Sequence, residues 1–289
     1  MGSSAAFNLL LRDEVYDISL IDGRSGMAVS HEMDLQQVIA AGASGSVRIV
    51  GMEDIASADV VVVSAAVPLT VNRSRMVYLR DNATILAAVA EALGDWPGVL
   101  VMVTNPVDPL VTWLHRRSGL DRRRLVGYTA NDSLRLRTGI GEVLGVPSSS
   151  VDAWVVGEHG DGSVPLFDRV LVGGEPVSLD AGQRAVAEEF VRGWYVRHVA
   201  LDSARSSTWT SGHGVARMVA ALSGAGAELW PASVVLAGEY GIDGAALTVP
   251  VTLDRGGVQE VHEWELSVAE QSAMVAAAAS VRAAADSLG

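Results

Sequence analysis

The chain has 289 residues, of which 49% are hydrophobic and 19% are charged, a balance typical of a folded protein with a substantial core. Its formal net charge of −13 repels nucleic acid phosphates and anionic lipid headgroups, so we expect neither nucleic acid nor a membrane as a partner. The absence of cysteine excludes disulfides and zinc–thiolate sites, and no signal peptide or membrane-length apolar run is evident, so we predict a cytoplasmic protein without a metal.

The first 127 residues alternate short apolar strands with helices. Strands are predicted at "YDISLID" (16–22), "VRIV" (47–50), "ADVVVVSA" (58–65), "VLVMVTN" (99–105) and "RLVGY" (124–128), and helices near 26–40, 76–93 and 107–117. This alternation is typical of a parallel sheet with helices on both faces, and continuous apolar strands indicate that both faces are buried. We therefore predict a doubly wound α/β, dinucleotide-binding domain over residues 1–127.

The pattern changes after about residue 150 to a mixture of short strands and longer helices. Strands are predicted at "VDAWVVG" (151–157), "ASVVLAG" (232–238), "ALTVPVTL" (246–253) and "VQEVHEWEL" (258–266), and helices near 180–202, 209–224 and 267–287. The last helix has apolar positions that fit packing along one face. We predict an α+β catalytic and substrate domain over residues 128–289.

The opening "MGSSAAFNLL" resembles an expression-tag remnant, but its spacing favours another interpretation. Gly2 lies twenty residues before Asp22, which ends the first predicted strand. In a dinucleotide-binding unit, a GxGxxG turn opens the helix beneath the pyrophosphate, and an acidic residue about 20 positions later bonds the ribose hydroxyls. Gly2 would then be the last glycine of that turn. The carboxylate of Asp22 would repel a 2′-phosphate, which favours NAD over NADP as the cofactor.

This interpretation leaves the first strand of a Rossmann-type sheet, and the earlier glycines of its turn, outside the sequence. That strand is central in the order 3-2-1-4-5-6, so its absence would expose two strand edges and remove much of the pyrophosphate cradle. We expect that Met1 occupies an internal position of the turn. The strand is then either encoded upstream or lost at the expense of NAD binding.

Two later strands end in residues suited to a nicotinamide pocket. Ala65 follows "ADVVVVS", and Asn105 with Pro106 ends "VLVMVTNP". Ligands of open α/β sheets bind at the carboxyl ends of the strands. Ala65 and Asn105 are therefore predicted to contact the cofactor together with Gly2 and Asp22.

Four polar residues supply the groups needed for hydride transfer on a 2-oxo acid. His159 lies in the glycine-flanked loop "VVGEHGDGSVPL", Asp132 precedes Arg135 by three residues in "NDSLRLR", and Arg75 lies in "NRSRM". The reaction needs a proton donor, a cation that polarises the carbonyl, and a planar cation that holds the carboxylate by two hydrogen bonds. On their own, His159 could equally be a packing residue, and Asp132 with Arg135 an exposed helical pair worth about 0.2–0.5 kcal/mol.

Four motifs in order resemble the lactate/malate dehydrogenase family: "GSSAAFNLL…LID", "TNPVD", "NDSLRLR" and "GEHGD". The resemblance spans essentially the whole chain. It implies an NAD-dependent oxidoreductase acting on the CH–OH group of a small 2-hydroxy acid, assembled as a homodimer or homotetramer.

The resemblance also implies a role for each matching residue. His159 would be the general acid and base, and Asp132 would orient it and stabilise its protonated form. Arg135 would clamp the substrate carboxylate, and Arg75, on a loop that closes over the substrate, would polarise the carbonyl.

Two further positions match the family's pocket. Asn105 would contact the substrate oxygen as well as the nicotinamide. Ser207, in "RSSTWTSG", would supply a small hydroxyl group that lines the pocket.

The closing loop "AAVPLTVNRSRM" departs from the family pattern. Six residues before the catalytic arginine, where Gln resembles lactate enzymes and Arg resembles malate enzymes, this chain has Leu69. A second substrate carboxylate would be desolvated there without a cation, whereas each buried methylene contributes about 0.8 kcal/mol. We therefore predict a monocarboxylic substrate. The alternative is a malate-type, dianionic substrate paired with Arg73. Asn131, where relatives have Leu, adds a polar group next to Asp132.

A second alternative is a catalytically silent binding or scaffold protein with impaired NAD binding, which the absent first strand suggests. Against it, all four polar catalytic positions are present. NADH binding by this chain, and turnover by a version extended upstream, would separate the two hypotheses.

Overall fold

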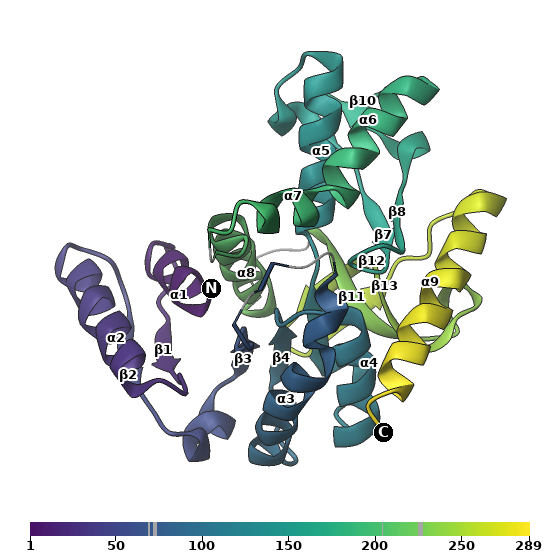
Figure 1. Cartoon of the computed structure of the whole chain (residues 1–289). Coiled ribbons are helices and arrows are strands. Elements are labelled where there is room, and N and C mark those ends of the chain that lie inside the picture. The colour runs from purple at the N-terminus through teal and green to yellow at the C-terminus, as the bar shows by residue number, and fades with distance from the viewer. Residues whose placement is uncertain (69, 72–73, 204, 225–227) are drawn as a thin grey trace.

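The structure, a computed structural model, describes residues 1–68, 70–71, 74–203, 205–224 and 228–289 (Figure 1). Leu69 and Arg73, on which the two substrate predictions depend, lie outside the described residues. The α-helices of the described residues are α1 (Gly2–Leu10), α2 (Ser25–Ala40), α3 (Leu79–Leu93), α4 (Val107–Ser118), α5 (Asn131–Leu144), α6 (Ala181–Arg192), α7 (Trp194–Ala200), α8 (Thr208–Leu222) and α9 (Val268–Asp286).

The strands form one large sheet and two small ones. They are β1 (Asp17–Leu20), β2 (Ser46–Ile49), β3 (Val60–Val63), β4 (Val99–Met102), β5 (Leu125–Tyr128), β6 (Val151–Asp152), β7 (Val155–Gly157), β8 (Ser163–Pro165), β9 (Leu171–Val172), β10 (Glu175–Pro176), β11 (Leu229–Ala237), β12 (Asp243–Asp254) and β13 (Gly257–Val261). The large sheet has the order β3-β4-β5-β11-β12-β7-β8, and β13 pairs with β12. The small sheets are β1-β2 and β10-β9-β6.

The parallel strands β3, β4 and β5 are covered by helices on both faces, as their apolar sequences predict. Along β4, Val99 and Val101 pack with α1 and α8, whereas Leu100 and Met102 pack with α3 and α4. All four are buried because successive strand residues point to opposite faces. This part of the molecule is the Rossmann-type, doubly wound unit expected from the sequence.

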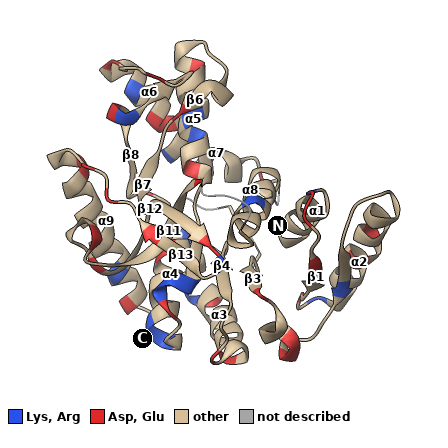
Figure 2. Cartoon of the chain, turned by 180° about the vertical axis from the view of Figure 1, so that it is seen from behind, with Lys and Arg blue, Asp and Glu red and all other residues tan. Residues whose placement is uncertain are grey.

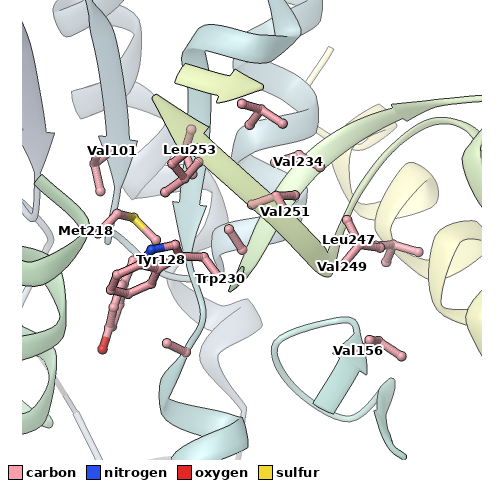
Figure 3. Packing of buried hydrophobic residues seen from close by; sticks show 14 of the residues in the cluster. Val101, Tyr128, Val156, Met218, Trp230, Val234, Leu247, Val249, Val251 and Leu253 are labelled. Carbon is pink, nitrogen blue, oxygen red and sulfur yellow. The ribbon is translucent and has the colours of Figure 1, made fainter. Parts of the chain in front are cut away.

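The largest hydrophobic cluster joins this unit to the second half of the chain. Tyr128 of β5, Met218 of α8 and Trp230 of β11 pack against Val101, next to the buried valines and leucines of β12 (Figure 3). Burying such a side chain contributes about 1.5–3 kcal/mol. The cluster thereby fixes the position of α8 against the sheet.

The pair β1-β2 is separate from the large sheet. Its strands are parallel, with Ile18 opposite Val47, and Leu10 and Leu35 of α1 and α2 pack on it. In the described residues, neither the second edge of β1 nor the outer edge of β3 has a strand partner. These two strand edges are therefore unpaired within the described part of the chain. Helix α1 packs on α8 instead, and this packing requires glycine at position 212, where a Cβ would lie 2.1 Å from the Ser4 hydroxyl.

Three elements differ from the sequence prediction. The strand expected over 151–157 is divided into β6 and β7, which belong to different sheets. The helix expected over 180–202 is divided at Gly193 into α6 and α7. The strand expected over 258–266 ends at Val261, because the Trp264 N–H donates to the Tyr240 hydroxyl and its ring packs edge-to-face on Trp154.

The predicted division of the chain after residue 127 falls within β5, which pairs in antiparallel fashion with β11. One sheet therefore runs through both predicted domains, and the division stays a prediction. Acidic and basic residues are interspersed along the helices and loops of the chain (Figure 2). None of the helices among the described residues combines the length and apolar character needed to cross a membrane.

Candidate active site

The loop between β7 and β8 holds His159 in a buried position. Gly157 at the start of this loop has φ +88°, and a Cβ there would lie 2.6 Å from the carbonyl oxygen of Gly162. The Glu158 N–H donates to that same oxygen at 3.1 Å, which closes the loop. The backbone N–H of His159 donates to Oδ2 of Asp108 at 2.6 Å. Glycine flanks and a buried carboxylate together fix where the imidazole lies.

One carboxylate connects the three central groups of the site. Asp132, in the first turn of α5, contacts Nδ1 of His159 through Oδ2 at 2.5 Å and accepts a hydrogen bond from Nη1 of Arg135 on Oδ1 at 2.7 Å. Asp132, His159 and Arg135 expose only 5%, 8% and 9% of their surfaces. The exposed helical pair considered from the sequence is thus wrong for Asp132 and Arg135, because both are buried against the histidine loop.

The protonation of Asp132 follows from these contacts. Burial alone would raise its pKa, but the neighbouring His159 and Arg135 outweigh burial and lower the pKa to about 2. The position of Asp132 in the first turn of a helix also favours a negative charge. Asp132 is therefore a carboxylate throughout the neutral range.

The imidazole of His159 is balanced between opposing effects. Burial lowers its pKa, Asp132 raises it, and the charges of Arg75 and Arg135 lower it further, so that the net pKa lies below the ordinary value of 6.5. With Asp132 ionised, Nδ1 is the nitrogen that carries the proton of neutral imidazole. Near pH 7 this leaves Nε2 as the nitrogen that gains or loses a proton.

Arg75 lies close enough to this group for its charge to act on His159. It is the first residue of a short 3₁₀ helix (Arg75–Tyr78), and its guanidinium carbon lies 4.4 Å from the centre of the Tyr195 ring. Burial and the neighbouring Arg135 lower its pKa to about 10, against the opposing charge of Asp132. Arg75 is still a cation at neutral pH.

The predicted nicotinamide-binding residues lie at the carboxyl ends of adjacent strands. Ala65 follows β3, and its carbonyl oxygen accepts a hydrogen bond from the Thr104 hydroxyl at 2.7 Å. Asn105 follows β4, and its carbonyl oxygen accepts from Nδ2 of Asn82 at 2.7 Å. The side-chain Oδ1 of Asn105 is buried and has no hydrogen-bond partner among the described residues. This unpaired acceptor fits a donor group of a cofactor or substrate.

The predicted adenosine and pyrophosphate contacts lie at the same edge. Gly2 opens α1 against the end of β3, where a Cβ would be 3.0 Å from the Ser64 hydroxyl. Asp22 follows β1, is exposed, and accepts a hydrogen bond from the Arg24 N–H at 2.8 Å. A helix N-terminus attracts phosphate groups. An exposed carboxylate at the end of a strand, as Asp22 is after β1, can accept hydrogen bonds from the ribose hydroxyls. The residues present therefore fit NAD.

Two further residues singled out in the sequence, Ser207 and Asn131, lie at the starts of helices. Ser207 is the N-cap residue of α8, half-buried, and makes no side-chain capping hydrogen bond. Asn131 is buried: its Nδ2 donates to Ser211 at 2.8 Å and its Oδ1 accepts from the Tyr128 hydroxyl at 3.0 Å. Asn131, the polar group next to Asp132, therefore joins α5 to β5 and α8.

Sequence reasoning missed three residues of the site. Asp108 ends the quoted motif "TNPVD", so the signal was present but was given no role. Trp194 and Tyr195 form an aromatic pair directly after Gly193, and no spacing in the sequence relates them to the arginines that they contact.

The site thus combines a histidine that can exchange a proton, two guanidinium groups and an NAD-compatible sheet edge. These groups allow a hydride to move to or from carbon 2 of a 2-oxo or 2-hydroxy acid, while the oxygen on that carbon gains or loses a proton. Fold and site together define an NAD-dependent dehydrogenase of 2-hydroxy acids.

Comparisons with known proteins identify the family. The lactate/malate dehydrogenase NAD-binding domain matches residues 1–127, and the lactate/malate dehydrogenase α/β C-terminal domain matches residues 129–288. The chain belongs to the lactate/malate dehydrogenase family, as the sequence motifs predicted, and its cofactor is NAD.

Relatives of both kinds align along the whole chain. The malate dehydrogenase of Halobacterium salinarum is 35% identical, and the L-lactate dehydrogenase of Lactobacillus delbrueckii subsp. bulgaricus is 33% identical; each alignment covers 100% of this chain and 96% of the relative. Among solved structures, Cryptosporidium parvum malate dehydrogenase has a TM-score of 0.92 at 28% identity, covering 99% of this chain and 95% of that one.

Proposed function

We propose that the chain interconverts a small monocarboxylic 2-hydroxy acid and its 2-oxo acid. The observation that carries this proposal is the set of positively charged side chains near Asp132 and His159. Among the residues that the structure describes, two arginines act on these two residues, Arg75 and Arg135, which provide for one carbonyl oxygen and one carboxylate. A second substrate carboxylate would need a third cation to offset its desolvation.

Each group has a defined part in this proposal. Arg135 offers the substrate carboxylate the N–H groups that do not face Asp132, and Arg75 polarises the carbonyl oxygen. When NAD is bound, it supplies the nicotinamide carbon that exchanges the hydride. During reduction, Nε2 of His159 gives its proton to the carbonyl oxygen, and during oxidation it takes the hydroxyl proton. Asp132 stabilises the imidazolium form through Nδ1.

A dicarboxylic, malate-type substrate is the second candidate. The relatives include malate dehydrogenases at 32% to 35% identity, and this similarity favours it. Arg73, the cation that would then pair with the second carboxylate, is outside the described residues. The catalytically silent alternative is not favoured, since full-length relatives are dehydrogenases and the buried His159–Asp132 pair is formed.

The test is a substrate panel with NADH: pyruvate, 2-oxobutyrate, phenylpyruvate and oxaloacetate. We expect kcat/KM for the best monocarboxylate to exceed that for oxaloacetate by about tenfold or more, the effect of leaving one buried charge unpaired. Binding of NADH is measured first by fluorescence, and His159→Ala is the inactive control. A higher kcat/KM with oxaloacetate would select the second candidate. Normal NADH binding without turnover of any acid would overturn both.

We further propose a homodimer or homotetramer. The exposed apolar residues of α2 support this proposal, and its test is given with the whole molecule below.

A further inference from the structure

We infer that Trp194 and Tyr195 of α7 are positioning residues that hold the two substrate-binding arginines in place. The guanidinium carbon of Arg135 lies 4.0 Å from the centre of the Trp194 ring, and that of Arg75 lies 4.4 Å from the centre of the Tyr195 ring. The two arginines come from α5 and from the loop after β3, so α7 is the element that both contact. This inference rests on the proposed function of Arg75 and Arg135.

Stacking suits the task of each arginine. A guanidinium group that packs its face on an aromatic ring keeps its N–H edge available for a carboxylate or carbonyl oxygen. Arg135 is held at Nη1 by Asp132, and its guanidinium carbon lies over the Trp194 ring. Two such contacts leave little rotational freedom, so the substrate carboxylate meets a guanidinium that is already oriented.

A second contact, with His198 of the same helix, holds the Trp194 ring in place. It stacks on His198, one turn later, with ring centres 4.5 Å apart and an angle of 11° between the planes. Nε2 of His198 lies 2.9 Å from the carbonyl oxygen of Arg205. The imidazole and the indole thus connect Arg135 to the segment that leads into α8.

The two rings belong to adjacent residues at the start of α7. Adjacent residues of a helix point about 100° apart, so neighbouring rings can reach two arginines that belong to different elements. Gly193 separates α6 from α7, and a Cβ there would lie 1.9 Å from Oε1 of Glu189. The two rings also place apolar surface beside both cations, which agrees with a monocarboxylic substrate.

The two contacts predict different kinetic effects. Trp194 acts through the carboxylate-binding Arg135, so its loss weakens ground-state and transition-state binding alike and raises KM. Tyr195 acts through Arg75, whose interaction with the carbonyl oxygen strengthens as negative charge develops, so its loss lowers kcat.

The experiment compares Trp194→Leu with Trp194→Phe, and Tyr195→Leu with Tyr195→Phe, because the phenyl variants keep an aromatic face. Steady-state kinetics are measured with the best substrate of the panel. The affinity of the NADH complex for oxamate, an unreactive isostere of a 2-oxo acid, is measured by calorimetry. Circular dichroism and thermal unfolding establish that each variant is folded.

We expect Trp194→Leu to raise KM and the oxamate Kd about tenfold with kcat changed less than about twofold, and Tyr195→Leu to lower kcat about tenfold with KM little changed. Both phenyl variants are expected within about threefold of wild type. In an Arg135→Lys background, Trp194→Leu has no further effect on oxamate binding if the indole acts through Arg135.

The inference is overturned by leucine variants that match wild type, by phenyl variants as impaired as the leucine ones, or by an unchanged effect of Trp194→Leu in the Arg135→Lys background. Failure of the proposed function looks different. In that case the wild type binds NADH but neither turns over a 2-oxo acid nor binds oxamate.

Discussion

At the scale of single residues, the site depends on one buried carboxylate that is charged and another that is protonated. Asp132 is surrounded by His159 and two arginines, and its pKa is lowered to about 2. Asp108 is wholly buried, and burial raises its pKa to about 8 even though it accepts the His159 N–H. Two carboxyl groups that flank one histidine thus have opposite protonation states at neutral pH because one has cations beside it and the other does not.

Asp108→Asn tests the cost of burying this carboxyl group. Below pH 4 the carboxyl is protonated in both the folded and the unfolded chain. Between pH 4 and pH 8 only the unfolded chain releases the proton, so the wild type loses stability as the pH rises, and asparagine does not titrate. We expect the difference in Tm, variant minus wild type, to become more positive from pH 5 to pH 8.

Calorimetric unfolding at both pH values measures this difference, and a constant or shrinking difference contradicts the prediction. Asp108→Leu is the matched control. Like asparagine it does not titrate, but it removes the acceptor of the His159 N–H, so we expect it to be less stable than Asp108→Asn by about 1–3 kcal/mol at both pH values.

The sequence predicted the residues that carry local motifs and missed those that act through distant contacts. His159, Asp132 and Arg135 lie in strings whose spacing is visible along the chain, and the structure brings them together. The stacking of Arg75 on Tyr195 joins residues 120 positions apart, and nothing in either local sequence specifies the other. Asp108 was visible in its motif, but its role depends on burial, which only the packed structure defines.

At the scale of elements, the same distinction applies to the strands and helices. The apolar runs of β3, β4 and β5 predicted their positions because both faces of these strands are buried. The division at Gly193 was missed, although glycine has a low helix propensity. The early end of β13 was missed because the packing of Trp264 on Trp154 overrides the strand propensity of the sequence.

The separate β1-β2 pair predicts uneven stability across the fold. Two short strands with one shared ladder and partly exposed side chains are held less firmly than strands paired on both sides. We expect peptides covering residues 17–20 and 46–49 to exchange amide hydrogens about tenfold or more faster than those covering 99–102 and 125–128. Mass spectrometry of hydrogen exchange measures this, and equal protection of the two regions would refute it.

Addition of NADH provides the control for that measurement. Gly2 and Asp22, the residues predicted to contact the cofactor, lie before and after β1 in the chain. Binding of NADH should therefore slow amide hydrogen exchange in β1 more than in β4.

At the scale of the whole molecule, α2 presents apolar side chains outward. Only Ala28 and Leu35 of this helix are buried, whereas Val29 and Met33 are exposed by 46% and 58%. A neighbouring exposed residue of β2, Ile49, extends this surface. Exposed apolar surface of this kind is typical of subunit interfaces, which supports the proposed homo-oligomer.

The double variant Val29→Glu, Met33→Glu tests this surface. We expect wild type to elute with at least about twice the 30.2 kDa mass of one chain and the variant to elute as a smaller species, because two charges per chain would be buried unpaired. Size-exclusion chromatography with light scattering measures both masses. Val268→Glu, at an 86% exposed position of α9, is the control expected to leave the mass unchanged. A monomeric wild type contradicts the proposal.

Strand β5 has a consequence for how such an enzyme can diversify. Its carboxyl end leads into Asp132 at the same sheet edge as Ala65 and Asn105, and its side pairs with β11 of the C-terminal half. The group proposed to exchange the proton and the edge predicted to bind the nicotinamide therefore adjoin one sheet, whereas Arg75 and the two aromatic rings lie on a loop and on the seven-residue helix α7. Mutations in those two peripheral segments can change the range of acids accepted while the stereochemical course of the reduction is inherited unaltered.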